Sequence, residues 1–145
     1  MDTFFINWFH ALDKGLDQMS QQECSRLFSA CASQCAKDAF EHLYRDLFDA
    51  CERNLDTFFS RLNEIDGIDG NVVQSGWVYE IIFKSCNCDL HTKAKMNSGK
   101  LCECSRQSIL CILGELAPNS TFDVEKVESI LDGAKICRFR ISKIS

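Results

Sequence analysis

The spacing of apolar residues changes near residue 70, and this change constrains the fold more than any other feature of the sequence. Before it, apolar side chains recur every three or four residues, most clearly along a stripe from Phe40 to Leu62, as in an amphipathic helix. After it, the spacing becomes two: Tyr79 and Ile81 share one face of an extended segment, and Glu80 falls on the other. Helices followed by strands are typical of an α+β fold.

The length of 145 residues predicts a single domain spanning residues 1–145. We expect a helical half over residues 1–66, with two to three helices, followed by a cysteine-rich sheet half over residues 71–145. The helical half should pack on an antiparallel sheet of three to five strands. Ser20 and Glu23 form a capping box that opens the second helix.

Turn signals divide the sheet half into strands and one inserted helix. The apolar pattern predicts that the helix runs from Ser105 to Leu116, after a turn at residues 97–99. A strand is predicted over residues 122–131, and the turn residues Asp132-Gly133 predict a hairpin that leads into the last strand.

Charge and hydropathy exclude several classes of function. A net charge of −5 argues against nucleic acid, because phosphate-binding domains carry an excess of lysine and arginine. No apolar run is long enough to cross a membrane, and the first residues lack the basic and apolar regions of a signal peptide. We therefore expect a cytoplasmic protein without a membrane partner, in which stable disulfides are disfavoured.

Two C-x-C pairs stand close together, Cys86 with Cys88 and Cys102 with Cys104. Zinc commonly takes four thiolates from two closely spaced pairs, so one interpretation is a zinc site on all four. A turn at residues 97–99 would bring the pairs together. The more usual zinc pair is C-x2-C, although residues i and i+2 of an extended chain also share a face.

A second interpretation is a reactive thiol, at Cys104 first and Cys102 next. Cys104 directly precedes the predicted helix, and both the helix N-terminus and Arg106 would favour a thiolate with a lowered pKa. His91, between the two pairs, is the candidate base for nucleophilic catalysis.

The third interpretation is burial, because cysteine packs as a small apolar residue. It is favoured for Cys24, Cys51, Cys111 and Cys137, which lie on apolar faces. Cys31 and Cys35, one turn apart on the second helix, either pack or supply ligands from across the core. Glu80 is a further candidate for a polar pocket group or general base.

The segments CECSRQSILCILGEL and VESILDGAKICRFRISKI carry a resemblance to known families. The ending from Ser129 to Ile141 resembles the closing hairpin of four-vinyl reductase (hydrocarbon-binding) domains, and is similar to bacterial aminothiazoline-carboxylate hydrolase-like proteins. The resemblance covers residues 77–144 and implies a pocket between sheet and helices for a small, partly apolar molecule. It also implies metal on clustered cysteines in some members of the first family, and hydrolytic opening of a sulfur heterocycle in the second.

Three functions follow as hypotheses. The leading one is a cytoplasmic small-molecule-binding protein with an apolar pocket beside the two C-x-C pairs. The alternatives are a hydrolase of a small sulfur heterocycle with a cysteine nucleophile, and a thiol- or zinc-based sensor. The expected partner is a small, partly apolar molecule, and a homodimer is a candidate assembly.

Overall fold

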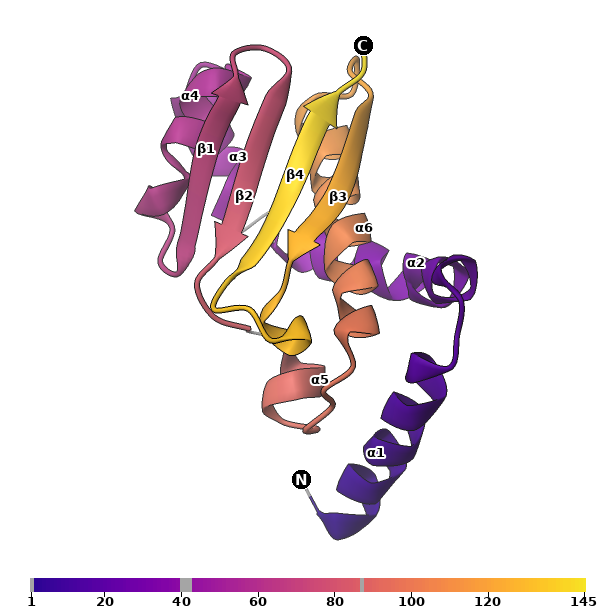
Figure 1. Cartoon of the computed structure of the whole chain (residues 1–145). Coiled ribbons are helices and arrows are strands. Elements are labelled where there is room, and N and C mark those ends of the chain that lie inside the picture. The colour runs from indigo at the N-terminus through magenta and orange to yellow at the C-terminus, as the bar shows by residue number, and fades with distance from the viewer. Residues whose placement is uncertain (1, 40–42, 87) are drawn as a thin grey trace.

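The computed structural model describes residues 2–39, 43–86 and 88–145 (Figure 1). The first residue of the predicted apolar stripe, Phe40, lies outside this part of the chain. Within it, a helical N-terminal part precedes a four-stranded antiparallel sheet, so the predicted α+β class is confirmed.

The strands are β1 (Ile68–Gln74), β2 (Val78–Phe83), β3 (Phe122–Glu128) and β4 (Cys137–Lys143). Their order across the sheet is β1-β2-β4-β3, and each neighbouring pair is antiparallel. Helices cover one face of this sheet and leave the other face open (Figure 1). The covered face is therefore where a site between sheet and helices can form.

The described helices are α1 (Thr3–Asp17), α2 (Gln21–Ala39), α3 (Arg45–Ala50), α4 (Leu55–Ser60), α5 (Asp89–Thr92) and α6 (Cys102–Leu116). Four of them precede the sheet, where we expected two to three. Between β2 and β3 the chain adds the one-turn helix α5 to the single inserted helix that was predicted. In Figure 1, α2 crosses behind α6, and α1 extends away from the sheet.

The long helix predicted up to Leu62 is broken between α3 and α4. Glu52 and Arg53 have φ angles of 56° and 58°, which a continuing right-handed helix does not allow. Asn54 then caps α4, its side-chain oxygen accepting a hydrogen bond of 3.0 Å from the backbone N–H of Thr57. The apolar stripe continues through the break because both short helices pack on the same core.

Helix α6 begins earlier than the predicted Ser105. A 3-10 turn, η3 (Gly99–Leu101), leads directly into it, and the Ser98 hydroxyl caps that turn by accepting from the Lys100 N–H at 3.2 Å. Cys102 and Cys104 are therefore inside the first turn of α6, not in front of it.

Strand β3 also ends before its predicted limit at residue 131. A 3-10 turn, η4 (Ile130–Asp132), follows it, and Ser129 caps this turn through the Asp132 N–H at 3.2 Å. Gly133, with a φ of 100°, then takes a left-handed conformation that few other residues adopt. The connection to β4 is thus longer than the tight hairpin that we predicted.

Two apolar clusters hold these layers together. The larger fills the space between the sheet and the helices, and Phe59 stacks on Tyr79 within it at a centroid distance of 4.4 Å. The smaller cluster, which includes Leu16, Phe28 and Met96, joins α1 and α2 to the segment around α5.

None of the helices in the described ranges is long and apolar enough to cross a membrane.

Gly70 of β1 offers a test of how closely the helical part packs on the sheet. A Cβ atom at this position would lie 2.3 Å from the backbone oxygen of Phe59, which cannot easily move. We expect Gly70→Ala to lower the free energy of unfolding by about 1–3 kcal/mol, as overpacking of a core does. Urea denaturation measures the change.

Gly114 is the matched control, because a Cβ there would meet nothing within 4 Å on α6. Gly114→Ala should raise stability by about 0.5–1 kcal/mol through helix propensity. An unchanged or stabilised Gly70→Ala protein would contradict the close approach of β1 and α4.

Candidate functional site: a thiol-lined cavity

A cavity of about 240 Å³ lies between the covered face of the sheet and the helices. Tyr44, at the start of α3, and Phe139, on β4, contribute aromatic walls. The described residues that line it are Cys35, Tyr44, Phe83, Ser85, Cys86, Cys88, Leu101, Cys102, Cys104, Ser105, Ser108, Ile109, Ile112, Leu131, Cys137 and Phe139. None of these carries a carboxylate, ammonium or guanidinium group, so the described walls are apolar or neutral and polar.

All four cysteines of the C-x-C pairs line this cavity. Strand β2 ends at Phe83, so Cys86 and Cys88 do not continue its alternation and can face the same space as that residue. Cys102 and Cys104 reach the cavity from the first turn of α6. The sequence pattern therefore located a shared neighbourhood, but the connection is α5 followed by η3, not a strand hairpin.

Two lining cysteines were not included in the predicted site. Cys137 was assigned to simple burial, although it shares the covered face of β4 with Phe139 and lines the cavity beside it. Cys35 comes from α2, far away in the sequence, and the helical spacing of Cys31 and Cys35 was the signal available for it. Only the packing of α2 across α6 brings Cys35 to the cavity.

The sulfur atoms fall into two groups. Cys104 lies near enough to Cys35, Cys88 and Cys31 for each of these thiols to raise its pKa. The pKa of Cys102 instead responds to Ser129, which lowers it, and to Cys137, which raises it. This separation follows from helix geometry, because residues i and i+2 of an α-helix lie roughly 200° apart around the axis.

Among the described residues, no three His, Cys, Asp or Glu side chains are grouped so that they could hold a metal ion. The four-thiolate zinc site predicted on Cys86, Cys88, Cys102 and Cys104 is therefore not formed in this structure. The divergence of Cys102 and Cys104 on the helix gives the physical reason. All ten cysteines, each within the described ranges, are free thiols.

Burial controls the acidity of the lining thiols. It is the largest effect on Cys104, whose pKa rises to about 12, and the neighbouring thiols add to the increase. Burial likewise raises the pKa of Cys102, although the Ser129 hydrogen bond and Lys126 oppose it. The expectation of a lowered pKa at Cys104 is wrong. Its side chain projects from α6 into the cavity and is partly buried there, so it is not exposed at a free helix end.

His91 does not pair with either predicted nucleophile. It lies on α5, and its Nδ1 atom is hydrogen-bonded to the backbone oxygen of Met96 at 2.8 Å. The described lining of the cavity does not include it. The predicted arrangement of Cys102 or Cys104 with a histidine base is therefore not assembled.

The raised pKa gives a test by alkylation. Brief treatment with limiting iodoacetamide at about pH 7 should label the exposed Cys31 at least about tenfold faster than Cys104, because the thiolate is the reacting species. Peptide mapping by fragment-ion spectra measures the two sites in the same sample. Preferential labelling of Cys104 would contradict the raised pKa of this thiol.

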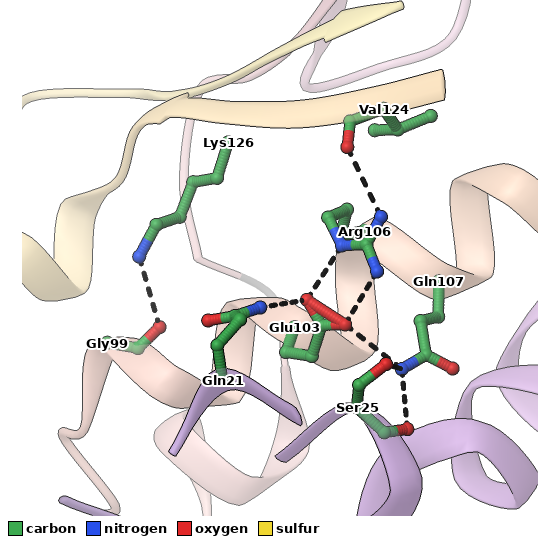
Figure 2. A network of polar contacts seen from close by, with 8 residues as sticks. All are labelled: Gln21, Ser25, Gly99, Glu103, Arg106, Gln107, Val124 and Lys126. Atoms are coloured by element: carbon green, nitrogen blue, oxygen red, sulfur yellow. Dashed lines mark hydrogen bonds and ion pairs between the residues drawn. The ribbon is translucent and has the colours of Figure 1, made fainter. Parts of the chain in front are cut away.

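A buried carboxylate fixes the turn of α6 that carries these thiols. Figure 2 shows Glu103 surrounded by donors from two helices. Its oxygens accept from Arg106 at 2.7 and 2.8 Å, from Gln21 at 2.7 Å and from Gln107 at 3.0 Å. Gln107 also donates to the backbone oxygen of Ser25 at 2.7 Å.

The same network reaches the sheet, since Arg106 donates to the backbone oxygen of Val124 on β3 at 3.3 Å (Figure 2). The first turn of α6 is thus connected to both α2 and β3. Burial acts to raise the pKa of Glu103, but the hydrogen bonds from Arg106 and Gln107 and the charge of Arg106 outweigh it, so the pKa lies below its ordinary value.

We expect Glu103→Gln to lower the free energy of unfolding at pH 7 by about 1.5–3 kcal/mol, the range for hydrogen bonds to a charged group. Because the folded-state pKa is below the unfolded one, this contribution is present at higher pH and is lost as the pH falls through the folded value. The difference in the free energy of unfolding between wild type and variant should therefore shrink as the pH falls below 4.5, the ordinary pKa of glutamate. Urea denaturation across pH measures it.

Glu115→Gln, at an exposed position of the same helix, is the control and should leave stability nearly unchanged. If the loss of unfolding free energy in Glu103→Gln stays constant down to about pH 3, ionisation of Glu103 does not stabilise the fold.

Glu80, a candidate pocket group or base, lies on the open face of the sheet. Its carboxylate accepts from Arg138 at 2.7 Å and from Arg140 at 3.1 Å. Burial acts to raise the pKa of Glu80, but the hydrogen bonds from Asn71 and the two arginines outweigh it, and the pKa is lowered. It neither lines the cavity nor has the raised pKa of a general base.

The chain was compared with protein families, curated proteins and solved structures. No protein-family model matches the chain, and no curated protein matches it. A trafficking protein particle complex subunit 3 from Naegleria fowleri, covalently bound to palmitic acid, is similar in structure with a TM-score of 0.49 and 11% sequence identity. The alignment covers 98% of this chain and 94% of that one. At this level the likeness carries no argument about what the present chain binds.

Proposed function

We propose that this chain is a cytoplasmic small-molecule-binding protein and that its ligand is an uncharged, partly apolar molecule held in the thiol-lined cavity. The observation that carries the proposal is a cavity beside the two C-x-C pairs whose described lining contains no ionised side chain. Ligand sites are typically concave and mostly apolar, with a few polar groups that fix orientation.

The chemistry of the walls supports an uncharged ligand. Burial raises the pKa of Cys86, Cys102 and Cys104, so these thiols are protonated at neutral pH. A charged ligand would lose its hydration without gaining a counter-charge from the described walls. The hydroxyl groups of Ser105 and Ser108 and the thiols remain as weak polar partners.

The volume supports a ligand of modest size. A cavity of roughly 150 Å³ accepts benzene, whereas drug-sized ligands use roughly 300 Å³ or more. The present 240 Å³ falls between them. Cys35 and Ser85 are exposed lining residues and mark where the cavity meets solvent.

Ten free thiols support the cytoplasmic part of the proposal, because reducing compartments keep cysteines unpaired. The hydrolase alternative lacks a comparable observation: neither Cys102 nor Cys104 is paired with His91, and both thiols have raised pKa values. We therefore advance binding, without turnover, as the function.

A fluorescent probe tests the cavity directly. We expect 1-aminonaphthalene, which is uncharged at neutral pH, to bind with enhanced emission, and Ser105→Phe to weaken its binding at least about tenfold by filling the cavity. Glu115→Phe places the same side chain at an exposed position of α6 and should leave binding unchanged. Fluorescence titration gives the dissociation constants, and circular dichroism confirms that both variants fold.

The charged analogue 1-aminonaphthalene-5-sulfonate provides a second readout on the wild-type protein. It should bind more weakly than the uncharged probe, since the described walls offer no counter-charge. Equal affinity for the two probes, or unchanged binding to Ser105→Phe, would overturn the assignment of the ligand to this cavity.

A further inference from the structure

Two helices that cross each other contribute thiols to the same cavity. Cys35 belongs to α2 and Cys104 to α6; both line the cavity, and each lies near enough to change the pKa of the other. Cys31, one turn earlier on α2, and Cys88 are near enough to interact electrostatically with Cys104. Two cysteines that lie far apart in the sequence are therefore neighbours in the cavity wall.

The backbones that carry this pair are held in place. One turn beyond Cys104, the Ser108 hydroxyl donates to the backbone oxygen of Ala32 at 3.1 Å. On the neighbouring side of α6, Gln107 donates to the backbone oxygen of Ser25. The crossing of α2 and α6 is thus held by hydrogen bonds next to the thiol pair, and we expect bond formation to require movement of side chains rather than of helices.

We propose that Cys35 and Cys104 form a redox-active dithiol that low-molecular-weight disulfides, such as oxidised glutathione, convert to an intramolecular disulfide. The proposal goes beyond the proposed binding function and does not depend on it.

The reaction proceeds by two thiol–disulfide exchanges. Cys35 loses its proton, its sulfur forms a bond to one sulfur of the external disulfide, and the external S–S bond breaks to release one thiol. Cys104 then loses its proton and attacks the Cys35 sulfur, which releases the second thiol. The protein gives up two protons and two electrons, and the external disulfide is reduced to two thiols.

The exposure of the two thiols and their effect on each other's pKa decide which one reacts first. Cys35 is exposed, whereas Cys104 is partly enclosed, so an external disulfide reaches Cys35 first. Burial raises the pKa of both thiols, but their interaction with each other lowers the pKa of Cys35 and raises that of Cys104. Cys35 is thus the attacking thiol and Cys104 the resolving one, and the exchange should accelerate as the pH rises above neutral.

The test uses the full chain incubated with either oxidised or reduced glutathione, quenched with iodoacetamide and digested with trypsin without reduction. Cleavage leaves Cys31 and Cys35 in the peptide 27–37, and Cys102 and Cys104 in the peptide 101–106. The expected product is a disulfide-linked pair of these two peptides, formed only in the oxidised sample.

Four serine variants identify the sulfur atoms, because each peptide contains one proposed and one control cysteine. Cys35→Ser and Cys104→Ser should each abolish the crosslink, whereas Cys31→Ser and Cys102→Ser should each retain it. Glutathione should remain attached to Cys35 in the Cys104→Ser protein, since the resolving thiol is absent.

Thermal unfolding adds a readout that does not depend on peptide recovery. Closing so long a loop should raise the melting temperature of the oxidised wild type by about 5 °C or more, and the increase should be absent in Cys35→Ser. Crosslinks through Cys31, Cys88 or Cys102, glutathione adducts without a crosslink in the wild type, or no reaction at all would each overturn the proposal.

Discussion

The position of the first turn of α6 depends on the buried carboxylate of Glu103, and the cavity depends on that turn. A carboxylate that is 5% exposed is stable only when its oxygens are well paired, and Glu103 achieves this with donors from α2 and from its own helix. Arg106 extends the connection to β3. Since Cys102 and Cys104 flank Glu103 in sequence, the same contacts that satisfy the carboxylate also place the thiols in the cavity wall.

Enclosure explains why these cysteines differ from activated thiols. A nucleophilic cysteine needs a neighbouring cation or a free helix N-terminus that favours the thiolate. At Cys104 burial is the dominant effect, and its sulfur neighbours raise the pKa further. A cluster of protonated thiols provides a neutral lining for an apolar ligand, and it also places Cys35 and Cys104 where an oxidant can join them. The proposed ligand binding and the proposed thiol exchange are therefore compatible with one cavity.

The sequence predicted those parts of the fold that depend on regular spacing. The alternation along β2 and β4 and the apolar face of α6 agree with the structure because each reflects burial of one face. The break after Cys51 was missed because the apolar stripe continues across it, although Asn54 offered a capping signal. The early start of α6 was missed because Ser98 caps the preceding 3-10 turn, whereas the N-cap residue of α6 itself, Leu101, makes no side-chain capping hydrogen bond.

The candidate site was predicted only in part, for a reason that lies in tertiary structure. Local spacing was sufficient to select Cys86, Cys88, Cys102 and Cys104, all of which line the cavity. It could not show that Cys102 and Cys104 diverge towards different neighbours, because this follows from their place inside the helix. Nor could it pair Cys35 with Cys104, because that contact requires α2 to cross α6.

The neutrality of the cavity depends finally on the register of β4. Cys137 and Phe139 face the cavity, whereas Arg138 and Arg140 alternate with them and reach Glu80 on the open face. A slip of one residue would exchange these faces and place two guanidinium groups in the cavity. The Glu80 carboxylate opposes such a slip because it would lose both arginine partners. An ion pair on one face of the sheet thus maintains an uncharged wall on the other.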